Sequence, residues 1–369
     1  MRSRSKSRKS RKSPAGRIFA QLGYALLCAA LVGFVFWLWP GGEPGRQTEP
    51  APVAAPPAKN RPASPAPALA PPPPALPPLK PAAAGARPVE SILEAQIALV
   101  RQGLSPGSID GREGAQTRAA LSAFQKRQGL SQTGSLNGPT KSILLIDDPV
   151  MTEYTVTSED LGRLRPVPAT WLEKSEQPRL DFENILELLG EKAFTDPQLI
   201  RALNPSVNWN ALADGTRVTL PRVDYPAVGE KAAFLKISLE QCVLEAFDAR
   251  TNLLVHFPCS IGRIAAKRPV GELHVITIAL NPNYTYDPAL FSESPEAQTA
   301  GQKLIIPPGP NNPVGVVWIG LDRPGYGIHG TPGPEQVGRT ESHGCFRLAN
   351  WNASYLAKLA WIGMAVNVE

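Results

Sequence analysis

Alternating hydrophobic and polar positions dominate the last third of the chain. Apolar residues recur at every second position from Leu235 to Leu239, and two later runs flank the turn-forming segment 248–252. A period of two is typical of strands with one buried face. The pattern therefore predicts a mostly β domain over residues 232–369. Its expected strands cover 235–239, 243–247, 253–261, 275–279 and 314–319.

Between residues 89 and 147 the apolar spacing becomes helical. Positions 92, 95, 96, 99 and 100 share one helix face, and positions 117, 120, 121, 124 and 125 share another. A third short helix is expected at 140–145. Turn-forming residues separate the first two runs, at Ser105-Pro106-Gly107 and Asp110-Gly111. This region is predicted to be a small three-helix module.

Residues 152–222 mix the two periods and predict a small α/β segment. A strand is expected to begin at 154–156, and helices are expected at 182–189 and 197–203. The second helix should end at Asn204-Pro205. A turn and a short strand are expected within 212–221.

The N-terminal region is organised differently. Residues 18–39 form a run of 22 residues in which Gln21 is the one strongly polar side chain. About 20 apolar residues suffice for a transmembrane helix, and the basic residues before it predict that the N-terminus is cytoplasmic. A cleaved signal peptide is the alternative. Residues 40–88 hold 17 prolines and 13 alanines, which predicts an extended linker.

Composition limits the classes of partner. The basic tail, residues 1–17, carries eight basic residues, and the remaining 30 basic residues face 32 acidic ones. The overall charge of +6 therefore belongs to the tail, and we expect no nucleic-acid partner. Cys28 falls in the predicted span. Cys242 and Cys259 fall opposite each other across the predicted hairpin, so we consider a disulfide between them, with two buried thiols as the alternative.

The candidate chemistry lies around Cys345. This cysteine sits in Ser342-His343-Gly344-Cys345, and His329 precedes it by sixteen positions. A thiol becomes nucleophilic as its thiolate, and a nearby imidazole is the usual base. Either His329 or His343 has the right chemistry. Gly330 follows His329 directly, so we expect a backbone carbonyl to orient that imidazole.

The Ser-His-Gly-Cys turn, preceded by His329-Gly330-Thr331, resembles the signature of the L,D-transpeptidase catalytic domain of bacterial cell-wall enzymes. The resemblance implies that Cys345 is the nucleophile, His329 the base and His343 a cleft residue assisting the acceptor. Backbone N–H groups at Gly344 and Cys345 would form the oxyanion hole, and Ser342 would hydrogen-bond within the turn. Gly330, Thr331 and Arg347 would contact substrate, although Arg347 equally suits a surface ion pair.

Other segments carry weaker resemblances. Asp110-Gly111, 117–121 and Phe124-Gln125 are similar to a peptidoglycan-binding module. The end of 152–222 resembles a LysM module, with a structural spacer as the alternative. The resemblance to L,D-transpeptidases also implies that the turn-rich run 306–315 lines the cleft and that Arg268-Pro269-Val270-Gly271 alters its edge.

Together these features predict a multidomain, single-pass membrane protein that acts on peptidoglycan outside the cytoplasmic membrane, in cell-wall biogenesis and cell shape. No cofactor or metal is expected, since a metallopeptidase would need a ligand motif that the four histidines do not supply. The acceptor is an amine of a second stem peptide, giving a 3→3 cross-link, or a lysine of a wall-attached protein. The alternatives are water, which makes an L,D-carboxypeptidase, and a catalytically inactive wall-binding scaffold. The expected segments are a basic tail (1–17), an anchor (18–39), a linker (40–88), a helical module (89–147), a LysM-like or spacer module (152–222) and a catalytic domain (232–369).

Overall fold

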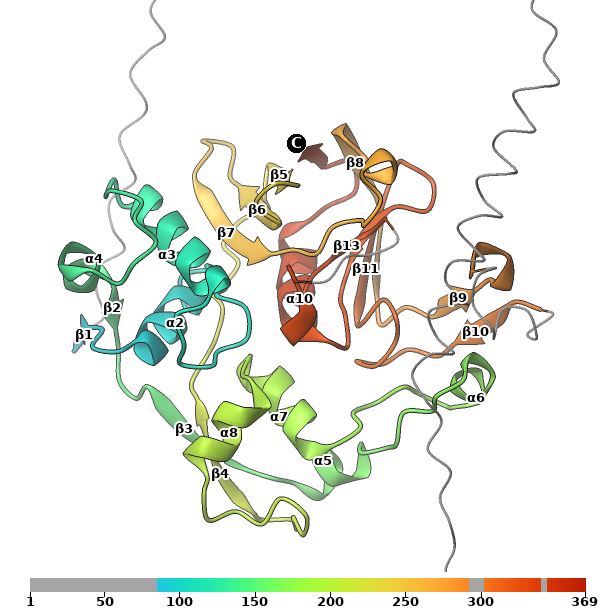
Figure 1. The fold of residues 1–369 in the computed structure, drawn as a ribbon, viewed down its shortest axis with the longest axis horizontal. Coiled ribbons are helices and arrows are strands. Elements are labelled where there is room, and N and C mark those ends of the chain that lie inside the picture. Colours follow the sequence, from blue (N-terminus) through green and yellow to red (C-terminus); the bar gives the residue numbers. More distant parts are fainter. Residues whose placement is uncertain (1–84, 292–301, 340–343) are drawn as a thin grey trace, which may run out of the picture. The chain divides into compact units, whose positions relative to one another are not determined.

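The computed structural model describes residues 85–291, 302–339 and 344–369 (Figure 1). The predicted tail, transmembrane anchor and most of the linker lie outside the described residues. Among the residues that are described, no helix combines the length and the apolarity needed to cross a membrane.

The three predicted helices of the first module are present. Ser91 caps the first helix by accepting from the Glu94 N–H, and Asn137 caps the third in the same way at Thr140. The third helix ends earlier than predicted, because Leu144 is extended and the next residues pair as a strand. The elements are β1 (Arg87–Pro88), α2 (Ile92–Val100), α3 (Ala115–Arg127), α4 (Gly138–Ile143) and β2 (Leu145–Ile146).

The middle segment, residues 151–221, folds around its own apolar cluster. Strands β3 and β4 pair antiparallel with Met151 opposite Pro221, and the two predicted helices lie between them in sequence. Leu188, Leu189 and Ile200 are fully buried in the cluster. The elements are β3 (Met151–Thr155), α5 (Ser158–Gly162), α6 (Trp171–Ser175), α7 (Ile185–Ala193), α8 (Pro197–Leu203) and β4 (Arg217–Pro221).

The C-terminal region contains an eight-stranded sheet in the order β13-β12-β11-β8-β14-β5-β6-β7. The five predicted strands all occur in it. Helix α10 packs against β11 and β12, and the hairpin β9–β10 forms a separate sheet. The elements are β5 (Phe234–Ser238), β6 (Val243–Phe247), β7 (Leu253–Pro258), η2 (Ala265–Lys267), β8 (Gly271–Leu280), β9 (Tyr284–Tyr286), η3 (Pro288–Phe291), β10 (Leu304–Ile306), β11 (Val317–Leu321), β12 (Gly327–His329), η4 (Pro334–Gln336), β13 (Phe346–Arg347), α10 (Asn350–Leu359) and β14 (Ala365–Val368).

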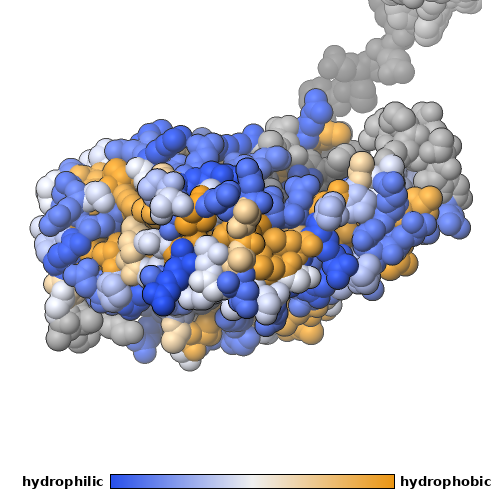
Figure 2. Space-filling model, turned by 90° about the horizontal axis from the view of Figure 1, so that it is seen from below, coloured by the Kyte–Doolittle hydropathy of each residue, from blue (hydrophilic) through white to orange (hydrophobic). Residues whose placement is uncertain are grey.

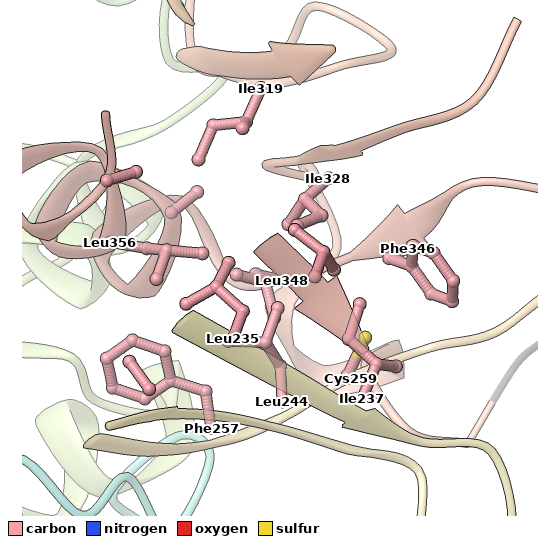
Figure 3. Close-up of a cluster of buried hydrophobic side chains, with 14 of the residues drawn as sticks. Leu235, Ile237, Leu244, Phe257, Cys259, Ile319, Ile328, Phe346, Leu348 and Leu356 are labelled. Atoms are coloured by element: carbon pink, nitrogen blue, oxygen red, sulfur yellow. The ribbon is translucent and has the colours of Figure 1, made fainter. Parts of the chain in front are cut away.

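The sheet and α10 enclose one hydrophobic core (Figure 3). Ile328 and Phe346 come from adjacent parallel strands and are both fully buried. Leu356 of α10 belongs to the same core, and Leu235 and Phe257 contribute to it from β5 and β7 (Figure 3). Burying such side chains stabilises the fold by about 1.5–3 kcal/mol each. The two short strands that carry the candidate site are therefore anchored by large apolar residues.

One face of the molecule is more polar than this core. Hydrophilic residues predominate on the face drawn in Figure 2, and hydrophobic residues gather there in several smaller patches. Small hydrophobic patches of this kind are normal on folded proteins.

The helical module joins the edge of this sheet. The Ser105 N–H donates to the His256 carbonyl at 2.8 Å, and the His256 N–H donates to the Gly103 carbonyl at 3.1 Å. Leu104 thus forms a parallel bridge to β7, the last strand of the sheet. Covering an edge strand satisfies its backbone groups.

The disulfide considered for the 242–259 pair is absent from the structure. The predicted register is right, because the Cys259 N–H donates to the Cys242 carbonyl at 2.8 Å. Both residues are nevertheless thiols. The Cys242 sulfur lies 3.7 Å from the Leu239 carbonyl, and the Cys259 sulfur lies 3.5 Å from the Ser260 carbonyl. Residues opposite on two strands are spaced wider than an unstrained bridge needs.

We predict that Gln96→Ala destabilises the helical module. The Gln96 side chain is fully buried, donates to Asp110 and Thr117, and accepts from the Gly111 N–H. Leaving these groups unpaired should lower the free energy of local unfolding by about 2–3 kcal/mol. Hydrogen exchange of the α2 and α3 amides in the whole protein measures this loss. The exposed Gln132→Ala is the control, and equal protection in the two variants would refute the prediction.

Candidate active site

Cys345 lies at the edge of the eight-stranded sheet, immediately before β13. Strands β12 and β13 run parallel, with His329 paired to Arg347 and Ile328 paired to Phe346. Side chains alternate along each strand, so Cys345, Arg347 and His329 share the face away from the core. The core face of the same two strands is occupied by Ile328 and Phe346. The alternation thus separates the reactive groups from the residues that hold them.

The His329 imidazole is held in one orientation. It is 5% exposed, its ring stacks on Trp318 with centroids 5.7 Å apart, and its Nδ1 lies 2.6 Å from the Gly330 carbonyl oxygen. A carbonyl can only accept, so Nδ1 carries the hydrogen and Nε2 keeps a lone pair. The partner is a backbone carbonyl, as the sequence predicted. Burial lowers the pKa of His329 to about 4, the Gly330 bond opposes this, and the Arg347 charge adds to it.

The Cys345 thiol donates a hydrogen bond to the backbone just before β12. Its Sγ lies 3.4 Å from the Gly325 carbonyl oxygen. Burial raises the pKa of Cys345, whereas a backbone hydrogen bond from Gly327 and the charge of Arg347 lower it. Burial thus favours the uncharged forms of both Cys345 and His329, and a thiolate forms when the thiol loses its proton.

Arg347 is the cation next to both reactive groups. Its backbone is fixed on two sides, by β12 and by a pair of hydrogen bonds of 2.9 and 3.0 Å with Ser260. Burial lowers the pKa of the guanidinium, while Cys345 and Tyr284 raise it. The charge favours a thiolate at Cys345 and disfavours an imidazolium at His329. Arg347 thus supports the nucleophile more than the base.

Glycines allow the backbone to close around Cys345. A Cβ added to Gly262 would lie 3.0 Å from the Gly344 Cα, and one added to Gly344 would lie 3.2 Å from the Tyr326 ring. Both values are tighter than ordinary contacts, so larger side chains would push the strands apart. Gly344 is in the turn where the sequence placed it. Ser342 and His343 lie outside the described residues, and their roles stay predictions.

The loop after His329 is held by neighbouring elements. The Thr331 hydroxyl accepts from the Gly333 N–H at 3.4 Å, which fixes the turn that leaves the strand. Further along, the Gln116 side chain of α3 donates to the Val337 carbonyl, and the Gly338 N–H donates to the Ser260 hydroxyl at 2.8 Å. The helical module therefore contacts the loop that connects His329 to Cys345.

The turn-rich run 306–315 packs behind His329. A Cβ added to Gly315 would lie 2.7 Å from the Gly330 Cα. Such an approach is possible only for glycine, so this run supports the peptide that follows His329. Arg268 of the variant Arg-Pro-Val-Gly segment donates from Nε to the Gly262 carbonyl at 2.7 Å, next to the Cys345 turn.

Several residues of the site were not identified from the sequence. Tyr284 belongs to β9, which no alternating run of the sequence predicted. Burial raises the pKa of its hydroxyl, and the nearby Cys345 adds to this effect. Trp318 stacks on His329, and the Tyr326 ring lies next to Gly344. Asn350, five positions after Cys345, begins helix α10, which the predicted strand pattern did not include.

The other two described histidines lie elsewhere. His256 pairs with Glu245 at 2.9 Å, and His274 pairs with Asp322 at 3.1 Å. Within the described ranges, no group of three or more His, Cys, Asp or Glu residues is placed to hold a metal ion.

We predict that Arg347→Gln shifts alkylation of Cys345 by iodoacetamide to higher pH. Arg347 lowers the pKa of the thiol, so its removal raises that pKa and reduces the thiolate at a given pH. Arg347→Lys keeps the charge and should shift the profile less. The rate is followed by mass spectrometry of the peptide that contains Cys345. An unchanged profile in Arg347→Gln would contradict the electrostatic role.

Comparison with known proteins places two matches on the chain. Residues 233–368 match the L,D-transpeptidase catalytic domain, and residues 89–144 match a putative peptidoglycan binding domain. The chain is 30% identical over 152 residues to a putative L,D-transpeptidase, YqjB, of Bacillus subtilis, covering 40% of this chain and 72% of that protein. It is 24% identical to the putative L,D-transpeptidase YkuD of Bacillus licheniformis, covering 50% and 92%.

Two solved structures are among those to which the chain is similar. The L,D-transpeptidase of Xylanimonas cellulosilytica is 16% identical, with a TM-score of 0.32, over 79% of this chain and all of that one. The L,D-transpeptidase of Mycobacterium smegmatis is 17% identical, with a TM-score of 0.30, over 42% of this chain and 63% of that one.

Proposed function

Because this chain belongs to the L,D-transpeptidase family, we propose that it transfers the acyl group of a peptidoglycan stem peptide through a thioester on Cys345. The observation that carries this proposal is the shared face of β12 and β13. That face brings together a thiol, an imidazole with a lone pair on Nε2, and a cation that favours the thiolate. Acyl transfer needs a nucleophile and a base of this kind.

In the first half-reaction, the Cys345 proton passes to His329 Nε2. The sulfur then attacks the carbonyl carbon at the L-centre of diaminopimelate in a donor tetrapeptide. The oxyanion is stabilised by backbone N–H groups at Gly344 and Cys345. The C–N bond breaks, D-alanine leaves with the proton from His329, and a thioester remains.

In the second half-reaction, an acceptor amine attacks the thioester carbon. His329 takes a proton from the amine, the C–S bond breaks as the acyl group forms a new amide, and the leaving Cys345 sulfur recovers that proton from His329. We propose that the amine belongs to a second stem peptide, giving a 3→3 cross-link, or to a lysine of a wall-attached protein. Gly330, Thr331 and Arg347 are proposed to contact the substrate, and His343 to assist the acceptor.

We further propose that the segments outside the catalytic domain hold the enzyme at the wall. The match to a peptidoglycan binding domain supports wall contact by residues 89–144. For residues 152–222, a LysM-like role in glycan binding is supported by the antiparallel pairing of β3 with β4 and by the helices α7 and α8 between them. Two further short helices, α5 and α6, precede α7. A membrane anchor at 18–39, with the catalytic domain on the outer side, is supported by the length and flanking charge of that run.

We predict that Cys345→Ala abolishes the reaction. With a tetrapeptide substrate, the wild type should release D-alanine and gain an acyl adduct on Cys345. The variant should lose at least about 10³-fold in rate, because no other group can form the thioester. Mass spectrometry of the protein and of the muropeptides measures both results.

Cys242→Ala is the matched control, since it removes a thiol that directly precedes β6 and belongs to neither β12 nor β13, and it should leave the rate unchanged. Turnover by Cys345→Ala at the wild-type rate would exclude Cys345 as the nucleophile.

A further inference from the structure

Two cavities meet at Glu191, near the end of helix α7. The first, of about 660 Å³, is lined by aromatic residues and by Asn350 of the catalytic domain. The second, of about 580 Å³, is bounded by Pro332 and Pro334 of the loop after His329. Glu191 lines both cavities. A side chain of the middle segment therefore lies next to the catalytic domain, behind the proposed base.

Glu191 makes a specific contact there. Its Oε1 accepts from Asn350 Nδ2 at 3.1 Å. Burial raises the pKa of the Glu191 carboxyl to about 8, and nearby Glu187 adds to this effect. The side-chain amide of glutamine has the same shape and offers Asn350 the same kind of acceptor oxygen.

The side-chain amide of Asn350 is hydrogen-bonded at both its nitrogen and its oxygen. It is 2% exposed, its Nδ2 also donates to the Pro310 carbonyl at 3.2 Å, and its Oδ1 accepts from the Val316 N–H at 3.2 Å. A side-chain amide that is held at both ends cannot rotate without losing hydrogen bonds. Of these three hydrogen-bond partners, Glu191 is the one that comes from the middle segment.

Asn350 in turn packs on the peptide that orients the base. A Cβ added to Gly330 would lie 2.1 Å from Asn350 Oδ1, so the amide rests directly on the Gly330 backbone. The carbonyl of Gly330 accepts from His329 Nδ1 at 2.6 Å. The contacts form a continuous path from Glu191 through Asn350 and Gly330 to His329.

We propose that Glu191 is a positioning residue for transpeptidation, acting through Asn350 on the Gly330 carbonyl that orients His329. This role rests on the proposed function of His329 as the base. The middle segment is then part of the catalytic apparatus as well as a spacer or a wall-binding module. Loss of Glu191 lets the Asn350 amide turn and loosens the histidine, and a small misplacement of a catalytic group slows the chemical step.

The test measures formation of the Cys345 thioester in the whole protein with a tetrapeptide donor. Glu191→Ala should lower the limiting acylation rate roughly 10-fold with KM within about twofold, because orientation affects the chemical step rather than ground-state binding. Glu191→Gln keeps an acceptor for Asn350 Nδ2 and should restore the rate to within about twofold of the wild type. Glu159→Ala, at an exposed position of the same segment, should have no effect.

A double-mutant cycle tests the path through Asn350. The double variant Glu191→Ala, Asn350→Ala should acylate no more slowly than Asn350→Ala alone, because the two residues act in series. Additive losses would overturn the path. Thermal unfolding of each variant tests whether a slower acylation rate results from a less stable fold.

The remaining outcomes separate this role from the proposed function. If the wild type forms the thioester and Glu191→Ala forms it equally fast, the positioning role alone is overturned. Equal losses in Glu191→Ala and Glu191→Gln, or a change confined to KM, would also overturn it. If the wild type forms no thioester on Cys345, the proposed function itself fails, and this role fails with it.

Discussion

The hydrogen bond from His329 Nδ1 to the Gly330 carbonyl is the interaction on which the site depends. At 2.6 Å it fixes both the orientation and the tautomer of the imidazole, and it directs Nε2 as the basic atom. The carbonyl belongs to the next residue in the chain, so its direction is set by the local backbone. Gly315, Gly330 and Asn350 pack together closely enough to leave that backbone little freedom. The close approach explains why glycine follows the histidine.

The site combines burial with reactivity. Burial lowers the pKa of His329 and raises that of Cys345, so it favours the uncharged forms of both groups. Moving the proton creates a thiolate and an imidazolium in a partly desolvated place. Arg347 favours the thiolate, and the Gly330 carbonyl favours the imidazolium. A thiolate that forms only when substrate is bound is also protected from oxidation between turnovers.

Much of the fold could be predicted from the sequence, because the alternation of strands and the spacing of helices are local signals. The hairpin 243–258 and the helices at 92–100, 115–127 and 197–203 all follow from such patterns. The site was only partly predictable. His329, Gly330 and Cys345 lie in short motifs, but Tyr284, Trp318 and Glu191 reach the site through tertiary packing that leaves no local pattern. The pairing of Cys242 with Cys259 shows a further limit, since the correct register did not imply a disulfide.

The most direct test of this account is ¹⁵N NMR of the histidine side chains in the whole protein, with His329 assigned by its loss in His329→Gln. The account predicts that His329 is neutral at pH 7, carries its hydrogen on Nδ1, and begins to be protonated only near its pKa of about 4. An imidazolium at pH 7, or a neutral ring with the hydrogen on Nε2, would contradict it.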